Sequence, residues 1–286
     1  MTSKHEGTAG IVGLSALVTG GGSGIGLGTS ARLIADGADV TICGRTEEKL
    51  QWAVETLGSV ASSGPHQAGR ARYVVADVTE EEQVAEAVRV AAGDRGRLDI
   101  LFANAGGGHH MGPMVDADVV GVRATFDLNL TGTFLCIKHG APLMAAGVGT
   151  GVGGGEAPGG SIIGMSSGAG GFPHRLLWAY GSAKAGVDML CKYAAEELGK
   201  DGIRVNSLQP GIIDDELMEF IVAGGPLLDD YLDGMPISRV GTVEDVASAV
   251  RFLAGPESTW VTGVNLPVDG GHHLRGGPNY ELLLGG

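Results

Sequence analysis

Cations, cysteines and long apolar runs are scarce in this chain of 286 residues, and each shortage excludes a class of protein. Only 19 lysines and arginines stand against 33 aspartates and glutamates, which leaves a formal net charge of −14. A chain this acidic lacks the basic face that binds phosphate backbones, so we expect no nucleic-acid partner. No apolar run approaches the roughly 20 residues that span a bilayer, and residues 1–10 contain no apolar signal-peptide core. We therefore expect no membrane partner and a cytoplasmic location.

Cysteine and histidine occur in patterns that argue against a metal site. The three cysteines are Cys43, Cys136 and Cys191. They are odd in number, far apart and set in apolar sequence, which favours buried, reduced thiols over disulfides or zinc ligands. His109 is adjacent to His110 and His272 to His273, so neither pair has the one-face helical spacing of a zinc site. We expect no bound metal.

Short apolar runs alternate with helical patterns along the chain. The runs are typical of buried strands and cover residues 14–18, 40–43, 72–76, 100–103, 161–165, 204–208 and 264–268. The helical patterns begin near Ile25, Glu47, Glu80, Asp118, Trp178 and Val243. Strands that alternate with helices form a parallel sheet through right-handed crossovers, with helices on both faces. The expected fold is therefore α/β and doubly wound, with a central parallel sheet of about seven strands.

A glycine-rich turn follows the first predicted strand. It reads Thr19-Gly-Gly-Gly-Ser-Gly-Ile-Gly26 and is followed directly by a helical pattern. Glycines let the backbone pass close to a pyrophosphate, and the amides at a helix N-terminus attract its negative charge. A lone glycine turn is a weak signal in a chain with 52 glycines. The strand before it and the helix after it are the context that a dinucleotide-binding turn requires.

Tyr180 and Lys184 lie one helical turn apart and so share a helix face. An isolated tyrosine has a pKa near 10, roughly three units too high for a base at neutral pH, and a neighbouring cation lowers that pKa. The pair can therefore act as an acid-base device. On spacing alone it is also typical of an ordinary surface helix, so its meaning depends on the other motifs.

Several further segments occur in a fixed order along the chain. They are Asp77-Val78, Asn104-Ala105-Gly106, Leu128-Asn129-Leu130, Ser166-Ser167, Pro210-Gly211 and Val268-Asp-Gly-Gly271. Together with the glycine turn and the Tyr180/Lys184 pair, they resemble the short-chain dehydrogenase/reductase family in its classical form. The resemblance covers residues 10–271. It implies that residues 1–286 form a single Rossmann-type domain and an NAD(P)-dependent oxidoreductase, which transfers a hydride between the cofactor and a ketone or secondary alcohol.

The same resemblance implies roles for individual residues. The catalytic set is Asn129, Ser167, Tyr180 and Lys184. Tyr180 exchanges the substrate's hydroxyl proton while Ser167 holds the same oxygen. Lys184 lowers the pKa of Tyr180 and binds the nicotinamide ribose, and Asn129 holds a water that connects Lys184 to solvent. The cofactor-binding set is Gly20, Gly22, Ser23, Gly24, Ile25, Gly26, Arg45, Asp77, Val78, Asn104, Ala105, Gly106, Tyr180, Lys184, Pro210, Gly211 and Ile213.

The end of the second predicted strand carries the evidence on cofactor choice. Gly44 stands where an NAD-dependent relative usually offers a carboxylate to the ribose diol, and Arg45 follows it. A missing carboxylate removes repulsion, and a guanidinium can bind a 2′-phosphate through two hydrogen bonds. NADP(H) is favoured, with NAD(H) as the alternative if Arg45 only stacks on adenine or faces solvent.

Three segments depart from the regular pattern. Residues 147–160 are mostly glycine, and we expect a flexible surface loop there. Many relatives carry a threonine shortly after the proline-glycine pair, where this chain has Asp215, so the cofactor contact cannot be transferred. A carboxylate that faced pyrophosphate would be unfavourable. Residues 212–240 are expected to form a mobile substrate lid, and the tail 272–286 either docks on a neighbouring subunit or frays.

The substrate is expected to be a small molecule with an apolar or aromatic body. His174 and Trp178 immediately precede Tyr180, so with Ser167 and Tyr180 they form the predicted substrate site. An alternative reaction within the same chemistry is reduction of a 3-oxoacyl thioester. A dinucleotide-binding sensor or scaffold without turnover is the alternative from another class, although the intact Ser167, Tyr180 and Lys184 argue against it.

The chain is also expected to form a homo-oligomer, most simply a tetramer. Two helical stretches, residues 118–144 and 178–198, carry more apolar positions than one buried face needs. These positions are Val122, Phe126, Leu130 and Phe134 in the first stretch and Val187, Leu190 and Ala194 in the second. Each helix could bury one side against the sheet and another against a symmetry-related copy. The alternative is that both stripes belong to the intramolecular core.

Overall fold

Seven parallel strands form the central sheet, in the order β3-β2-β1-β4-β5-β6-β9. The structure is a computed structural model that describes residues 10–61, 69–145 and 159–275. The strands are β1 (Ser15–Thr19), β2 (Asp39–Gly44), β3 (Ala71–Val75), β4 (Ile100–Ala103), β5 (Gly160–Met165), β6 (Ile203–Pro210) and β9 (Asn265–Val268). This confirms the doubly wound α/β fold and all seven strands that the sequence predicts.

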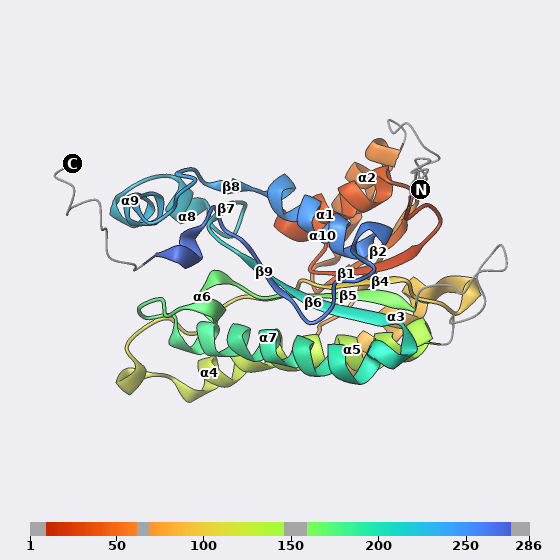
Figure 1. The fold of residues 1–286 in the computed structure, drawn as a ribbon, viewed down its shortest axis with the longest axis horizontal. Helices are drawn as coiled ribbons and strands as arrows, with labels where there is room; N and C mark the ends of the chain where they lie inside the picture. The colour runs from red at the N-terminus through yellow and green to blue at the C-terminus, as the bar shows by residue number, and fades with distance from the viewer. Residues whose placement is uncertain (1–9, 62–68, 146–158, 276–286) are drawn as a thin grey trace, which may run out of the picture.

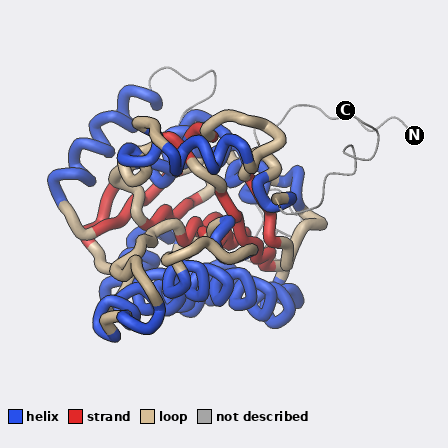
Figure 2. Tube along the Cα trace, turned by 90° about the vertical axis from the view of Figure 1, so that its left-hand side faces the viewer, coloured by secondary structure: helices blue, strands red, loops and turns tan. Residues whose placement is uncertain are grey.

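Two layers of helices cover the sheet (Figure 1). One layer contains α1 (Gly24–Ala35), α2 (Glu47–Ala61) and α10 (Val243–Ala254). The other contains α3 (Glu81–Ala92), α5 (Gly132–Ala145) and α7 (Trp178–Leu198). Figure 2 shows the strands lying between the two layers. Because both faces of the sheet are covered, every residue of β1 and β4 is buried.

Each helical layer has its own apolar core against the sheet. Phe102 belongs to the core beneath α1, α2 and α10, and its neighbour in β4, Leu101, belongs to the core beneath α3, α5 and α7. This alternation follows from the period of two along a strand. Full burial of such a side chain contributes about 1.5–3 kcal/mol. The two cores hold the sheet rigidly, so the residues that follow the carboxyl ends of its strands have fixed positions.

One helix layer contains a break in its hydrogen-bond pattern. Helix α4 (Val119–Phe126) continues through a π-helical turn, η3 (Asp127–Thr131), into α5. π-Helical turns are rare and often mark functional sites, because they displace side chains from their regular positions. This turn contains Asn129, whose side chain is fully buried.

The predicted lid, residues 212–240, lies at one end of the sheet. It contains β7 (Ile213–Asp214), α8 (Glu219–Val222) and α9 (Pro226–Asp233), and β7 pairs with β8 (Gly241–Thr242) beyond the lid. Helices α8 and α9 stand at the left of Figure 1. They pack on a small apolar cluster of their own around Ile212, Ile221 and Met235.

The ends of the remaining segments differ from the expectations. Gly160 starts β5, so the expected glycine-rich loop at 147–160 ends earlier than predicted, and its residues 147–158 lie outside the described residues. The tail begins with a short helix, η6 (His272–Leu274), that packs on the same chain, and residues 276–286 also lie outside the described part. Among the residues that the structure describes, no helix is long and apolar enough to cross a membrane.

Candidate active site

The glycine turn brings two backbone segments closer than side chains would allow. Gly20 has φ +66°, a conformation that favours glycine. A Cβ atom on Gly26 would lie 2.2 Å from the carbonyl oxygen of Gly20, so the first turn of α1 packs directly on the loop. Only glycine fits at Gly26. The turn therefore presents bare backbone beside the N-terminus of α1, which is the arrangement that receives a pyrophosphate.

Thr19 ties this turn to the end of the neighbouring strand β4. Its Oγ1 accepts hydrogen bonds from the backbone N–H groups of Asn104 (3.0 Å) and Ala105 (2.9 Å). Asn104 Nδ2 in turn donates to the Thr19 carbonyl at 2.9 Å. Thr19 was not among the predicted site residues, although this threonine is the first residue of the glycine motif. These bonds hold the Asn104 segment against the glycine turn at the centre of the sheet.

Tyr180 and Lys184 lie in the first two turns of α7, as predicted, and share a face. Lys184 Nζ lies 5.5 Å from the centroid of the Tyr180 ring and donates a hydrogen bond to the Met165 carbonyl at 2.7 Å. Ser166 Oγ donates to the Lys184 carbonyl at 3.0 Å, so this serine anchors α7 on the end of β5. Lys184 is almost fully buried.

Ser167 follows β5 and begins the short helix α6 (Gly168–Gly171). Its Oγ accepts from the Ala169 N–H at 3.2 Å and lies close enough to the Tyr180 side chain to influence the pKa of the phenol. The structure thus brings Ser167 and Tyr180 together, as the sequence led us to expect. Because the Ser167 hydroxyl is also held by the backbone, it has a defined position beside the phenol.

Asn129 is held in place by the π-helical turn. Its Nδ2 donates to the Thr125 carbonyl at 2.7 Å and to the Gly107 carbonyl at 2.7 Å, and its Oδ1 accepts from the Gly107 N–H at 3.2 Å. A Cβ atom on Gly106 would lie 2.7 Å from Asn129 Oδ1 and 2.8 Å from Lys184 Nζ. Asn129 and Lys184 therefore approach the same glycine, which agrees with the predicted connection between them.

The pKa values of the pair differ from what the sequence analysis predicts. Burial raises the pKa of Tyr180 to about 12; the hydrogen bond with Ser167 opposes this shift, and the nearby Tyr231 and Asp215 add to it. Burial also lowers the pKa of Lys184 to about 7, an effect that the charge of Asp188 opposes. The pKa of Tyr180 is thus raised in the cofactor-free protein, and its lowering by Lys184 and the nicotinamide ring stays a prediction for the cofactor-bound enzyme. A buried lysine with a pKa near neutrality carries only part of its charge, so it stabilises the phenolate less than a full cation.

The residues predicted to hold the adenosine half lie at the ends of β2 and β3. Arg45 is exposed directly after β2. The Asp77 carboxylate accepts from the N–H and the hydroxyl of Thr79, at 2.9 and 2.8 Å, which fixes the turn after β3. Val78 is buried, and a Cβ on Gly132 would lie 2.9 Å from its Cγ2.

Pro210, Gly211 and Ile213 close the other side of the site after β6. Gly211 N–H donates to the Val268 carbonyl at 3.1 Å, and Ile213 is buried. The glycine turn at the N-terminus of α1, with Lys184 and Asn129 gathered nearby at Gly106, is an arrangement that fits a nicotinamide dinucleotide. One group does not fit without moving: Asp215 Oδ2 lies 3.0 Å from the position that a Cβ would take on Gly24.

The predicted substrate residues lie in two aromatic contacts near Tyr180. Trp178 meets His110 edge-on with ring centroids 5.7 Å apart. His174 packs against Phe172 (4.8 Å). Two further members of this second cluster, Tyr231 of α9 and His272 of η6, were missed in the sequence analysis. No local motif marks them, because the lid and the tail bring them in from distant parts of the chain.

In the described ranges 10–61, 69–145 and 159–275, no group of three or more His, Cys, Asp or Glu residues is placed to hold an ion. The three cysteines are free and buried. Burial raises the pKa of Cys43 and of Cys191 to about 12, as expected for unreactive structural thiols.

Comparison with known proteins points to one family. The family model described as enoyl-(acyl carrier protein) reductase matches residues 20–273. The cis-4-hydroxycyclohexanecarboxylate dehydrogenase of Sinomonas cyclohexanicum is 36% identical over 259 residues, which cover 90% of this chain and 95% of the relative. The 2,5-dichloro-2,5-cyclohexadiene-1,4-diol dehydrogenase of Sphingobium indicum is 34% identical over 91% of this chain and 96% of the relative.

Solved structures agree with the sequence comparison. A short-chain type dehydrogenase/reductase from Mycobacterium ulcerans matches with a TM-score of 0.86 and 40% identity, over 96% of this chain and 94% of that chain. The fold, the order of the motifs and these relatives lead to the same conclusion. This chain belongs to the short-chain dehydrogenase/reductase family in its classical form, and it is an NAD(P)-dependent oxidoreductase of secondary alcohols and ketones.

Proposed function

We propose that Tyr180, Ser167, Lys184 and Asn129 are the catalytic residues of this oxidoreductase. The observation that carries the proposal is their convergence beside the glycine turn: Ser167 lies beside Tyr180, and Lys184 and Asn129 approach the same Gly106. The bound nicotinamide cofactor supplies or accepts the hydride. During reduction Tyr180 donates its phenolic proton to the carbonyl oxygen, and during oxidation it takes the hydroxyl proton back.

The other three residues position and assist this proton transfer. Ser167 donates a hydrogen bond to the same substrate oxygen and stabilises charge that develops on it. Lys184 holds the ribose hydroxyls of the nicotinamide half and, when charged, stabilises the phenolate. Asn129 fixes the backbone next to Lys184 and holds the water that links it to solvent. The high pKa of Tyr180 keeps the phenol protonated in the cofactor-free protein, ready to donate.

NADP(H) is the preferred cofactor in this proposal, with NAD(H) as the weaker alternative. The support is the pair Gly44 and Arg45 at the end of β2, where Arg45 is exposed and available to a 2′-phosphate. A carboxylate at position 44 would favour the ribose diol of NAD instead.

The proposed substrate is a cyclic secondary alcohol or the matching ketone. Phe172, His174, Tyr231 and His272 form an aromatic group with ring centroids 4.8–6.2 Å apart, and Tyr231 is close enough to affect the pKa of Tyr180. These aromatic side chains can pack against a substrate ring of similar size and flatness. The two curated relatives are named for six-membered rings that carry oxygen substituents, which supports the same class.

A screen of substrates tests the proposed function. Cyclic and open-chain ketones and secondary alcohols should be offered with NADPH, NADH and their oxidised forms, and turnover followed at the nicotinamide absorbance band. We expect turnover of cyclic substrates, faster with NADP(H). Turnover of acetoacetyl thioesters alone would instead favour the 3-oxoacyl-thioester reductase, and cofactor binding without any turnover would favour a sensor.

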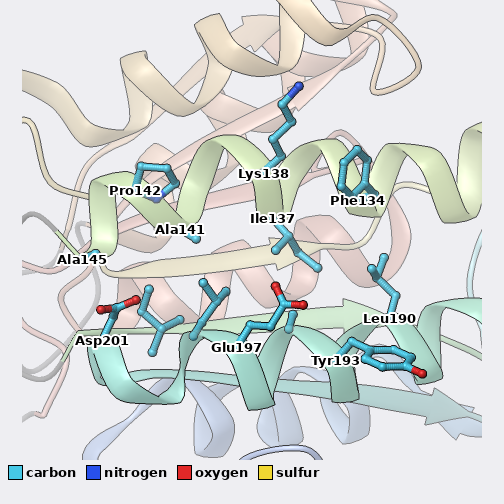
Figure 3. A pocket seen from close by; sticks show the side chains of 13 residues that line it. Phe134, Ile137, Lys138, Ala141, Pro142, Ala145, Leu190, Tyr193, Glu197 and Asp201 are labelled. Carbon is cyan, nitrogen blue, oxygen red and sulfur yellow. The ribbon is translucent and has the colours of Figure 1, made fainter.

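We also propose that the enzyme assembles as a homotetramer. A groove of about 490 Å³ lies between α5 and α7, and Figure 3 shows Ile137 and Leu190 pointing into the space between the two helices. At its margin Phe134 and Tyr193 keep 46% and 65% of their surface exposed. Val187 is fully buried, so one stripe of α7 faces the sheet while another stays open. A symmetric copy would cover this open stripe.

A cytoplasmic location belongs to the same proposal. It is supported by the three cysteines, which are buried and unpaired and which suit a reducing compartment.

The lid, residues 212–240, is proposed to move as substrate enters.

A further inference from the structure

The first residues of the lid lie on the glycine turn. Asp215 and Glu216 follow β7, and we call residues 215–218 the acidic strap. Asp215 Oδ2 lies 3.0 Å from the position that a Cβ would take on Gly24, and Asp215 Cβ and Cγ each lie 3.5 Å from it. Gly24 is the first residue of α1. The strap thus places a carboxylate at the N-terminus of the helix that would receive the cofactor's pyrophosphate.

Local hydrogen bonds fix the direction of the Asp215 side chain. Its Oδ1 accepts from the backbone N–H groups of Leu217 and Met218, at 3.0 Å each. This turn leaves Oδ2 facing Gly24. The pKa of Asp215 is raised by burial, and the like charges of Asp214 and Glu216 contribute in the same direction. The carboxylate is therefore half-buried beside the glycine turn.

Glu216 forms an ion pair with Lys49 beside the same turn. Its Oε1 accepts a hydrogen bond from Lys49 Nζ at 2.8 Å, across 167 residues of sequence. Lys49 also borders the glycine turn, because its Cβ lies 3.5 Å from the position that a Cβ would take on Gly22. The Lys49–Glu216 pair is exposed, with side chains 54% and 61% accessible, so it contributes little and is easily exchanged.

The N-terminus of α1 lacks anionic partners within its own sequence. Ser23 occupies the N-cap position but makes no side-chain cap hydrogen bond, and the first turn of α1 contains no acidic residue. The helix dipole and the free N–H groups there attract negative charge. The strap supplies that charge from a distant part of the chain.

We propose that Asp215 and Glu216 are internal counter-anions of the cofactor site, and that Lys49 is a ligand of the bound cofactor's phosphate groups. Cofactor phosphates replace Asp215 at the N-terminus of α1 and replace Glu216 on Lys49. The strap then leaves the glycine turn, and the rest of the lid moves with it. This inference rests on the proposed cofactor-binding function of the glycine turn, and it goes further by making the strap a determinant of cofactor affinity.

The exchange has a direct consequence for affinity. A carboxylate that must be displaced, and that stays close to the phosphates afterwards, weakens the binding of both cofactors. Lys49 and Glu216 act most on a cofactor with an additional phosphate, because a phosphate dianion competes for Lys49 better than a carboxylate does. Removing the strap's charge should therefore tighten binding, and removing the charge of Lys49 should weaken it.

Binding of NADPH and NADH to the full-length, cofactor-free enzyme tests the proposal, followed by nicotinamide fluorescence or calorimetry. Asp215→Asn keeps the Oδ1 acceptor that the strap turn uses, and Glu216→Gln changes an exposed side chain, so thermal melts should show both variants folded. We expect the double variant to bind both cofactors about fivefold tighter or better, the size of one close charge repulsion. Lys49→Met should weaken NADPH more than NADH.

Asp214→Asn is the matched control, because Asp214 is the exposed neighbour of Asp215, loses the same charge and belongs to β7. Inorganic pyrophosphate serves as a second probe and should compete with cofactor more strongly in the double variant. Equal cofactor affinities for wild type and the Asp215→Asn, Glu216→Gln double variant would overturn the proposed role of the strap. An equal gain in affinity in Asp214→Asn would do the same. Failure of every form, wild type included, to bind either cofactor would instead count against the proposed function of the glycine turn.

Discussion

Asn129 and Lys184 converge on one backbone atom, the Cα of Gly106, from two different helices. A Cβ there would lie 2.7 Å from Asn129 Oδ1 and 2.8 Å from Lys184 Nζ, distances that real Cβ contacts do not reach. The π-helical turn positions the first side chain, and the Met165 carbonyl positions the second. The missing side chain at Gly106 is thus a structural requirement for bringing the amide and the amine together.

Gly106→Ala should therefore damage the site selectively. The added methyl must push away either Asn129 or Lys184, so we expect turnover to fall by tenfold or more, about 1.4 kcal/mol in the barrier. Steady-state kinetics measure the effect. Gly107→Ala is the control, since its Cβ would meet only Leu128 Cδ2 at an ordinary 3.8 Å. Equal activity in the two variants would show that the close approach at Gly106 is not needed.

The buried Lys184 predicts a pH dependence of stability. Its pKa is about 7 in the folded, cofactor-free protein and near the ordinary lysine value of 10.5 when unfolded. Above pH 7 the unfolded chain binds a proton that the folded protein lacks, so the free energy of unfolding should rise with pH. Urea unfolding between about pH 6.5 and 8.5 measures this slope. The buried cysteines act in the opposite direction only near and above their ordinary pKa of 9.0.

Lys184→Met supplies the comparison for this slope. Methionine fills similar space without a titrating group, so the rise attributable to residue 184 should disappear while the fold is kept. An unchanged slope in Lys184→Met would mean that Lys184 is charged in the folded protein throughout this range.

Cofactor preference can be shifted at the end of β2. Arg45→Ala should weaken NADP(H) binding by about 1.5–3 kcal/mol and affect NAD(H) much less, because a charged hydrogen bond to the 2′-phosphate is lost. Gly44→Asp should move preference toward NAD(H). The site has room for it, since a Cβ on Gly44 meets only Leu50 Cδ2 at 3.6 Å. Affinities for both cofactors in each variant decide the matter, and equal losses in Arg45→Ala would exclude phosphate recognition.

The groove between α5 and α7 predicts the oligomeric state. Light scattering at micromolar concentration should give four times the chain mass of 29.0 kDa. Tyr193→Glu places a charge on an exposed position of this face and should lower the measured mass without lowering the stability of the monomer. A wild-type enzyme that scatters as a single 29.0 kDa species would refute the proposed assembly.

The fold was predictable because its signals are local and periodic. The first strand and the glycine turn were placed to within one residue, since an apolar run and a helix start each have a sequence signature. The helix that carries Tyr180 begins at Trp178, as predicted. The order of the motifs then determined which residues gather at the ends of the strands.

The parts that the sequence did not reveal depend on long-range packing. Tyr231 and His272 reach the substrate side from the lid and the tail, and Lys49 meets Glu216 across the glycine turn. No spacing along the chain encodes such contacts. The raised pKa of Tyr180 in the cofactor-free protein follows from burial, which the spacing of residues along the chain does not encode.

The central claim is that Tyr180 transfers the proton, and Tyr180→Phe tests it most directly. This change removes the phenolic oxygen but keeps the ring that packs beside Lys184. Turnover of a cyclic ketone with NADPH and the affinity for NADPH should be measured on the same preparation. We predict that turnover is lost while NADPH affinity stays within about threefold of wild type, a change below 1 kcal/mol. Turnover near the wild-type rate in Tyr180→Phe would contradict the account.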